Sequence, residues 1–222
     1  ASHVDGLIVH TVGGNDDMLI DINSGRLPVV LVDRLIDDDS IPSVSSPNFQ
    51  TAYKSTQMLY NMGYEIIGYV GEERKKISPR IERRKAYEAA CAEKGQTPFV
   101  LELDPIDSFC CDKFIKSLLK KHPGKRVGLL CGNGVSCQQV LLAMNRMNMI
   151  SGYDFGLCTF DDWDWLQLAK PGITSIQMGT EEKGIATAKL LVERINSASA
   201  GDVKHIEIPT RTILRNSTTS TP

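Results

Sequence analysis

The sequence has no long apolar run and no excess of basic residues. No apolar stretch among the 222 residues approaches the ~18 residues of a membrane-spanning helix, so we expect no contact with a membrane. Lysine and arginine together number 25 against 27 acidic residues, which gives a formal net charge of −2. Domains that grip nucleic acid usually carry a basic excess or a basic stripe, so we do not expect these residues to bind DNA by themselves.

Cysteine is present six times, but never as a C-x-x-C pair. Cys131 and Cys158 lie inside apolar, strand-like runs, and the overall spacing does not resemble a disulfide framework, which is typical of much shorter chains. The remaining cysteines are Cys91, Cys110, Cys111 and Cys137. We therefore expect reduced, mostly buried thiols and a cytoplasmic protein.

The sequence also lacks the short motifs that mark cofactor, nucleophile and metal sites. VGGNDD and CGNGVS each follow an apolar run, yet neither spells a dinucleotide-binding or P-loop motif. There is no G-x-S-x-G elbow, and the four histidines lie far apart without metal-ligand spacing. We expect no cofactor, no metal and no enzymatic activity, although a strand end before a helix still offers backbone donors to a ligand.

One segment does concentrate chemistry-bearing side chains. Residues 156–176 read GLCTFDDWDWLQLAKPGITSI and hold both tryptophans and three aspartates within four positions, Asp161, Asp162 and Asp164. These carboxylates could bind Mg²⁺, or Asp161 could act as a phosphatase nucleophile, but the D-x-D-x-T strand and lysine partner of haloacid-type phosphatases are missing. An indole can instead stack on a sugar ring while a carboxylate accepts hydrogen bonds from its hydroxyls. We favour recognition over reaction.

Apolar runs of four to seven residues alternate with amphipathic helical stretches along the chain. Strands are predicted over 4–10, 27–32, 65–70, 99–103, 126–131, 154–160, 172–177, 205–208 and 212–214. Helices are predicted over 16–24, 48–62, 78–94, 108–121, 133–147 and 181–196, and a loop over 37–46. Runs such as VVLV, VGLLC and FGLC are typical of parallel strands buried on both faces. The pattern predicts an α/β fold with one or two open, doubly wound parallel sheets.

The order of short motifs along the chain resembles that of a known family. VDGLIV, LPVVLVDR, NMGY and IIGYVGE occur in the first third, followed by RRKAY, GNG, LCTFDD, PGITSI and KGIA. The effector-binding core of LacI/GalR-type transcription regulators typically reads V-D-G-I-I, P-V-V-x-x-D-R, L-x-x-x-G-H and I-x-x-[IL]-x-G at the first four of these places. Each motif is weakly specific alone, but together they cover the chain from Val4 to about Arg215 in the order of that family.

The resemblance implies a type I periplasmic-binding-protein-like fold, in which two Rossmann-like lobes with parallel sheets are joined by three crossovers. The N-terminal lobe would comprise residues 1–63 and 178–204, the C-terminal lobe residues 64–177 and 205–217, and residues 218–222 would be a disordered tail. The helix-turn-helix and the first strands that precede V-D-G in the family are missing from this sequence. We therefore expect a truncated N-terminal lobe in which residues 4–10 form a sheet edge.

The resemblance also implies an effector site. Arg83 occupies the position whose guanidinium contacts the effector, and a planar fork of donors suits a carboxylate or vicinal hydroxyls. Asp161 matches the effector-contacting aspartate, and Trp163 could form a platform for a sugar ring. Asn133 suits a contact with a hydroxyl, a helix N-cap, or both. Further candidate residues are His10, Thr11 and Asn48. The alternatives are a solvated surface position for Arg83 and a packing role for the tryptophans, above all Trp165.

Three positions depart from the family pattern. Pro47 and Gly134 stand where the family has aspartate, and Ala86 stands where it has glycine. The loss of two acidic acceptors close to several arginines favours an anionic effector. The segment D-D-W-D-W-x(5)-P-G-I-T is moreover similar to the branch of the family that answers keto-sugar acids. We therefore predict a sugar-acid effector such as a 2-keto-3-deoxygluconate-like compound.

The implied function is that of the effector-sensing and dimerisation domain of a LacI-type regulator. A small sugar or sugar acid would bind in the cleft between the lobes and allosterically control DNA binding by the absent N-terminal helix-turn-helix. The resemblance implies a homodimer, because operator half-sites mirror a two-fold axis, and contact with operator DNA only through the absent domain. The alternative is a solute-binding protein of a sugar transporter, which shares the two lobes.

Overall fold

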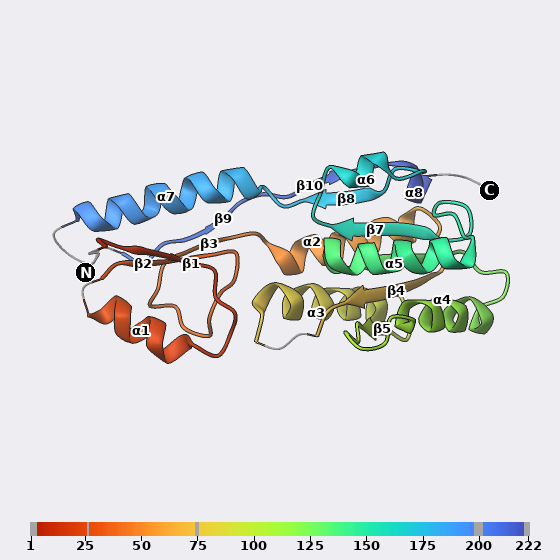
Figure 1. Cartoon of the computed structure of the whole chain (residues 1–222), viewed down its shortest axis with the longest axis horizontal. Coiled ribbons are helices and arrows are strands. Elements are labelled where there is room, and N and C mark those ends of the chain that lie inside the picture. The colour runs from red at the N-terminus through yellow and green to blue at the C-terminus, as the bar shows by residue number, and fades with distance from the viewer. Residues whose placement is uncertain (1–3, 26, 74–75, 198–201, 220–222) are drawn as a thin grey trace. The chain divides into compact units, whose positions relative to one another are not determined.

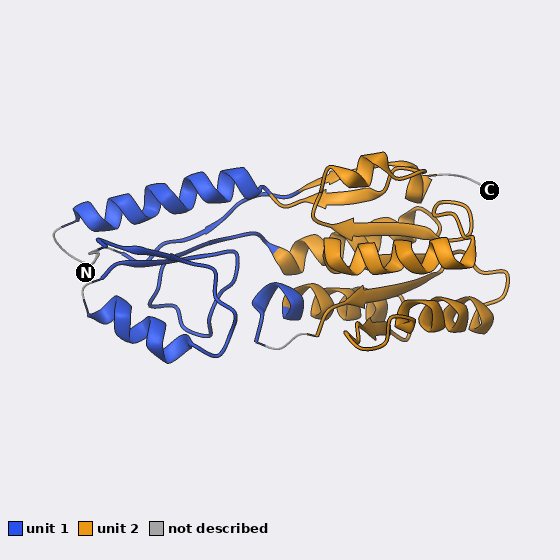
Figure 2. Cartoon of the chain, in the orientation of Figure 1, with its two compact units in different colours: residues 1–47, 74–81, 179–210 blue, residues 48–73, 82–178, 211–222 orange. Residues whose placement is uncertain are grey.

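The computed structural model describes residues 4–25, 27–73, 76–197 and 202–219. The chain forms two compact units (Figure 2). Unit 1 consists of residues 1–47, 74–81 and 179–210, and unit 2 consists of residues 48–73, 82–178 and 211–222.

Unit 1 is built on a four-stranded parallel sheet with the order β1-β2-β3-β9 (Figure 1). The strands are β1 (Leu7–Val9), β2 (Val29–Val32), β3 (Ser43–Ser45) and β9 (His205–Glu207), and the helices are α1 (Asp16–Ser24) and α7 (Thr180–Asn196). Alternate residues of β2 face opposite sides of the sheet. Leu31 packs with Leu19 of α1, whereas Val30 packs with Leu190 of α7. As expected, β1 lies at an edge of this sheet.

Unit 2 contains a six-stranded sheet with the order β10-β8-β7-β6-β4-β5, parallel except for β10. The strands are β4 (Ile66–Gly71), β5 (Phe99–Glu102), β6 (Val127–Cys131), β7 (Gly156–Phe160), β8 (Thr174–Gln177) and β10 (Arg211–Ile213). The helices are α2 (Asn48–Asn61), α3 (Ser78–Glu93), α4 (Cys110–Lys121), α5 (Gly134–Met147), α6 (Trp165–Leu168) and α8 (Asn216–Thr219); the first turn of α3 belongs to unit 1.

Helices cover both faces of the six-stranded sheet, as the continuous apolar runs predict. Tyr69 of β4 and Leu130 of β6 belong to a core cluster with side chains of α2 and α3. Val70 and Leu129, the neighbouring residues of the same strands, belong to a second cluster with side chains of α4 and α5. The prediction of a doubly wound parallel sheet is confirmed.

The order of strands in unit 2 reverses between β4 and β6. From β4 the chain passes to β5 on one side, and it then continues through β6, β7 and β8 on the other. In doubly wound sheets this reversal leaves a crevice outside the carboxyl ends of the two strands, which is where ligands bind in this class of fold. The topology thus predicts a ligand-binding site among the residues that follow β4 and β6.

The observed units differ from the predicted lobes at residues 48–63, 74–81, 178 and 205–210. Residues 48–63, predicted within the N-terminal lobe of residues 1–63, belong to unit 2, because α2 packs against β4 and β6. Residues 205–210, predicted within the C-terminal segment 205–217, belong to unit 1, because β9 pairs in parallel with β3. Sequence motifs located the helices and strands, but not the partners against which they pack.

Two local predictions are wrong. The predicted loop over residues 37–46 contains strand β3, whose polar sequence hides its position between β2 and β9; Ser43 Oγ lies 2.9 Å from His205 Nδ1. The predicted disordered tail over residues 218–222 begins inside α8, and Thr218 is buried there because the Tyr64 hydroxyl donates to its carbonyl at 3.2 Å. Residues 220–222 lie outside the described residues.

Tyr87 provides a first test of the packing of unit 2. Its fully buried hydroxyl donates to the carbonyl of Ile67 at 2.7 Å and accepts from the backbone N–H of Phe99 at 2.9 Å, which ties β4 to the edge strand β5. We expect Tyr87→Phe to lower the free energy of unfolding by about 1–2 kcal/mol, because two backbone groups lose a partner. Urea denaturation measures this, and an unchanged midpoint would contradict the packing described.

Candidate ligand-binding site

The predicted site residues of unit 2 gather at the carboxyl ends of β4, β6 and β7. They come from α2, α3 and the segments that follow β6 and β7. Arg83 binds Asn48 and the carbonyl of Gly132, and both Asp161 and Trp163 lie against Gly134. The five residues are Asn48, Arg83, Asn133, Asp161 and Trp163. This is the end of the sheet where the strand order reverses, and we call this group the strand-end cluster.

Arg83 is the buried centre of the strand-end cluster. Its side chain is not solvated, because the residue is only 6% exposed. Nη1 donates to the carbonyl of Gly132 at 2.7 Å, Nε donates to Asn48 Oδ1 at 2.9 Å, and the guanidinium carbon lies 4.2 Å from the centre of the Phe160 ring. These contacts fix the planar guanidinium, while Nη2 makes no hydrogen bond within the described part of the chain. A fixed donor of this kind suits an oxygen of a ligand.

Asn133 serves first as the N-cap of α5. Its Oδ1 accepts from the backbone N–H of Ser136 at 2.9 Å, and Ser136 Oγ accepts from the Asn133 N–H at 3.1 Å, so the two residues form a capping box. Asn133 Nδ2 donates to Glu72, which follows β4. The amide therefore bridges the two strands at which the sheet order reverses, and the N-cap interpretation is confirmed. A direct contact with a hydroxyl stays a prediction.

Asp161 is the first residue after β7, and its backbone is in the left-handed region, with φ of 68°. Its Oδ2 accepts from the backbone N–H of Gly134, the first residue of α5, at 3.1 Å. A carboxylate at this place interacts favourably with the positive end of the helix dipole. Left-handed backbone is uncommon outside glycine, although aspartate tolerates it better than most residues. The conformation is thus held by the carboxylate contact with α5.

Trp163 lies against the same helix start. A Cβ atom at Gly134 would come within 2.8 Å of its indole, so the ring leaves no room for a side chain there. This is a steric reason for glycine where the family pattern has aspartate. Trp163 is 42% exposed and meets Trp165 edge to face, with ring centres 5.9 Å apart, while Trp165 itself packs on the core. The packing interpretation of Trp165 is confirmed, and Trp163 keeps an accessible surface.

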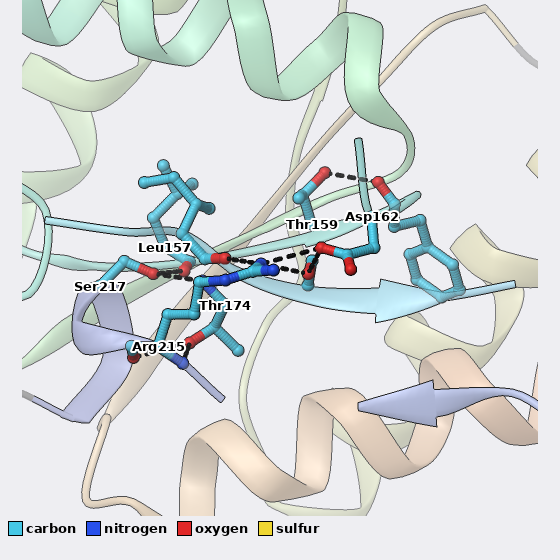
Figure 3. Close-up of polar contacts among 9 residues, drawn as sticks. Leu157, Thr159, Asp162, Thr174, Arg215 and Ser217 are labelled. Carbon is cyan, nitrogen blue, oxygen red and sulfur yellow. Dashed lines mark hydrogen bonds and ion pairs between the residues drawn. The ribbon is translucent and has the colours of Figure 1, made fainter. Parts of the chain in front are cut away.

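Asp162, the neighbour of Asp161, binds elsewhere in unit 2 (Figure 3). Its Oδ1 accepts from Ser175 Oγ at 2.6 Å and lies 2.8 Å from Arg215 Nη1. Burial alone would raise the pKa of the Asp162 carboxyl, but the hydrogen bonds from Arg215 and Ser175 outweigh burial and hold that pKa below its ordinary value of 3.8. Sequence reasoning did not find this pair, because 53 positions separate the two residues and no motif joins them.

The lowered pKa of Asp162 predicts acid sensitivity. A carboxyl with a lower pKa in the folded state than in the unfolded chain stabilises the fold above pH 3.8, and this contribution is lost as the pH falls below that value. We expect Asp162→Asn to be less stable than the parent at neutral pH, with the difference shrinking in acid. Urea denaturation of both proteins at neutral pH and at pH about 3 tests this, and an equal difference at the two pH values would contradict it.

In unit 1, the two predicted residues His10 and Thr11 follow β1. Thr11 is buried, and its carbonyl accepts from Arg34 Nη1 at 3.0 Å, so it serves the local fold. His10 Nε2 lies 3.6 Å from Asp33 Oδ2. Asp33 also forms an ion pair with Lys183, which is only 5% exposed. The sequence indicated neither this pair nor its burial, since Asp33 and Lys183 lie 150 positions apart.

The described residues were also compared with what a metal site, a disulfide or a membrane-spanning helix requires. No three histidine, cysteine or acidic side chains among them gather as ligands for a metal ion. All six cysteines are free and five are buried, and burial raises the pKa of the Cys158 thiol to about 12. None of the helices described is both long and apolar enough to cross a bilayer. The distinctive chemistry is therefore the strand-end cluster, with a fixed guanidinium, carboxylates and a partly exposed indole.

The comparison with family models agrees with this architecture. A model described as periplasmic binding protein-like domain matches residues 56–218, which is most of the chain. The chain belongs to this family. Its two units with parallel sheets are the architecture that the resemblance to LacI/GalR-type regulators implies, and that fold prediction is confirmed.

Relatives within the family carry names of transcription regulators. The chain is 27% identical to the HTH-type transcriptional regulator KdgR of Bacillus subtilis over 98% of its own length, and 30% identical to the HTH-type transcriptional regulator PtxS of Pseudomonas putida over 97%. It spans 64% and 62% of the length of these two relatives. The predicted resemblance to LacI-type regulators is thereby confirmed.

A solved structure of a transcription regulator has a similar fold. The LacI family transcriptional regulator from Enterococcus faecium, crystallised with bound ribose, superposes with a TM-score of 0.82 at 19% identity, over 99% of this chain and 81% of that one. At this level of identity the likeness concerns the fold alone.

Proposed function

We propose that this chain is the effector-sensing part of a LacI-type transcription regulator, and that the strand-end cluster of unit 2 binds the effector. The observation that carries the proposal is the convergence of Arg83, Asn133 and Asp161 at the reversal of strand order, where α/β sheets bind ligands. Hydrogen bonds fix each of the three side chains before any ligand arrives. Such preorganisation lowers the entropic cost of binding.

The chemistry of the strand-end cluster suits a carbohydrate. Asp161 and Glu72 offer carboxylate oxygens as acceptors for hydroxyl groups, and Arg83 Nη2 offers a donor. Trp163 presents an indole surface on which a sugar ring can stack. The ribose complex of the Enterococcus faecium regulator supports a sugar as the class of ligand.

Within that class we propose a sugar acid of the 2-keto-3-deoxygluconate type. The guanidinium of Arg83 carries a positive charge, and its Nη2, which makes no hydrogen bond within the described residues, can donate to a carboxylate oxygen. Gly134 and Pro47 stand where the family pattern has aspartates, so two negative charges are missing from the positions next to Asn133 and Asn48 in the sequence. Both features favour an anion over a neutral hexose.

The proposed mechanism is a linked equilibrium without a chemical step. An effector that binds one arrangement of the protein better than another shifts the population towards it, and this changes the affinity for DNA by the same coupling free energy. Base contacts would come from a helix-turn-helix outside this sequence, as the names of the relatives suggest. We further propose a homodimer, which matches two half-sites on operator DNA, and a cytoplasmic location, which suits six free cysteines.

Thermal-shift and calorimetric screens on the full-length protein test the proposal. 2-Keto-3-deoxygluconate and gluconate are compared with ribose and glucose, and a ligand at 100 times its Kd is expected to stabilise the protein by about 2.7 kcal/mol. We expect an acid to stabilise, and an operator fragment to bind with an affinity that the same acid changes. Tight binding of neutral hexoses and none of the acids would refute the sugar-acid proposal. Sugar binding without DNA binding would instead favour the alternative function, a solute-binding protein of a sugar transporter.

A further inference from the structure

Asp161 and Asp162 are adjacent in the sequence, but their carboxylates bind different parts of unit 2. The Asp161 carboxylate accepts a hydrogen bond from the first residue of α5. The Asp162 carboxylate instead binds Ser175 of β8 and Arg215, which lies between β10 and α8. We propose that Arg215 is a positioning residue of the ligand site, which acts through Asp162 to hold Asp161 and Trp163 in place. This inference rests on the proposed function, because it concerns the same site.

The side chain of Arg215 is anchored at three oxygens by one nitrogen atom. Nη1 donates to the carbonyl of Ile173 at 2.7 Å and to Ser175 Oγ at 2.8 Å, and it pairs with Asp162 Oδ1 at 2.8 Å. The side chains of Arg215 and Asp162 are only 18% and 17% exposed. A charged pair that is largely removed from water and supported by further hydrogen bonds holds its geometry far better than a surface pair.

The backbone around Arg215 is itself fixed to the strands of the site (Figure 3). Its N–H donates to Thr174 Oγ1 at 2.9 Å, and its carbonyl accepts from the same hydroxyl at 2.9 Å. The fully buried Ser217 donates from Oγ to the carbonyl of Leu157 at 2.5 Å and accepts from the N–H of Thr174 at 2.8 Å. Leu157 lies in β7 and Thr174 in β8, so the C-terminal segment spans both strands.

The turn after β7 is thus held on both sides. On one side α5 binds the carboxylate of Asp161, and on the other the C-terminal segment binds the carboxylate of Asp162. The left-handed backbone of Asp161, with φ of 68°, costs energy that its surroundings must offset. When Arg215 is removed, the turn loses one of its two anchors, and both the carboxylate of Asp161 and the indole of Trp163 lose their fixed positions. Binding sites depend on such supporting contacts.

The fluorescence of Trp163 can report whether its indole keeps its position. In a full-length Trp165→Phe background Trp163 is the only indole in this region, and acrylamide quenching of its fluorescence measures its accessibility without any ligand. Arg215→Met keeps the length of the side chain and removes the charge. We expect it to raise the quenching constant roughly twofold through local opening. We also expect the Kd for 2-keto-3-deoxygluconate to rise about tenfold through the loss of one well-placed charged hydrogen bond.

Two further variants separate positioning from general stability. Tyr87→Phe removes buried hydrogen bonds between β4 and the edge strand β5 without touching Asp162 or Arg215, so it should lower the unfolding midpoint while leaving Trp163 quenching unchanged. Asp162→Asn should reproduce the effect of Arg215→Met, and the double variant should be no worse than either single one. Quenching by Arg215→Met equal to that of Tyr87→Phe, or additive effects of Arg215→Met and Asp162→Asn, would overturn the inference. A parent protein that binds no sugar acid would refute the proposed effector, and the quenching series would still decide the role of Arg215.

Discussion

Replacing Arg83 with alanine is expected to lower the free energy of unfolding by about 3 kcal/mol, since two hydrogen bonds from a charged group are worth roughly 1.5 kcal/mol each or more. The guanidinium is buried, and its donors bind the carbonyl of Gly132 and the side chain of Asn48. Alanine also removes the contact with the Phe160 ring. Because Arg83 joins α2 and α3 to the end of β6, its loss should loosen the whole strand-end cluster and abolish effector binding.

Arg84, the next residue of α3, provides the matched control. It forms ion pairs with Glu88 and Glu102, whose side chains are 35% and 41% exposed. Arg84→Ala should therefore cost no more than about 1 kcal/mol, as is usual for exposed pairs. Urea denaturation followed by far-ultraviolet circular dichroism measures both variants. Equal losses for Arg83→Ala and Arg84→Ala would contradict a structural role of the buried guanidinium.

Restoring the family aspartate at position 134 is expected to destabilise this protein. A Cβ atom there would lie 2.8 to 2.9 Å from three carbons of the Trp163 indole, and the new carboxylate would stand beside that of Asp161 at the start of α5. An aspartate in the first turn of a helix normally stabilises it through the dipole. We nevertheless expect Gly134→Asp to lower the free energy of unfolding by about 2 kcal/mol, a typical cost of overpacking.

The steric origin of this effect has its own check. In the double variant Gly134→Asp/Trp163→Ala the indole is removed, so the clash disappears and most of the lost stability should return, measured against Trp163→Ala alone. A loss of similar size in both backgrounds would show that the indole does not decide the residue at position 134. Thermal unfolding of the four proteins gives the coupling free energy directly.

Local motifs and periodicity predicted much of this fold. Helix α1 spans the predicted residues 16–24, and β6 and β7 lie within their predicted ranges, because buried parallel strands and amphipathic helices leave a period in the sequence. Strand β3 escaped prediction, since its sequence is polar and it is a strand because it pairs with β2 and with the distant β9, where Ser43 Oγ lies 2.9 Å from His205 Nδ1. Tertiary context decides such segments, and periodicity does not record it.

The residues of the site, like the elements of the fold, could be predicted only in part. Residues at strand ends, such as Asn133 and Asp161, could be named from their place beside apolar runs and from the family pattern. Their partners could not be predicted. Glu72 binds Asn133, and Arg215 binds Asp162, from segments tens of positions away. In unit 1 the same is true of Lys183 and Asp33. A long-range ion pair has no local signature, so only the folded chain shows that the two neighbouring aspartates have different roles.

Calorimetric titration of 2-keto-3-deoxygluconate into full-length wild-type protein, Asp161→Ala and Asp164→Ala measures whether the strand-end cluster binds the effector. Asp164 lies three positions further on, is exposed and makes no side-chain cap to α6, so it matches Asp161 in charge but not in place. We expect Asp164→Ala to bind as the wild type does, and Asp161→Ala to bind about 100-fold more weakly through the loss of charged hydrogen bonds to the sugar. Equal affinities for the three proteins would contradict an effector site at the strand-end cluster.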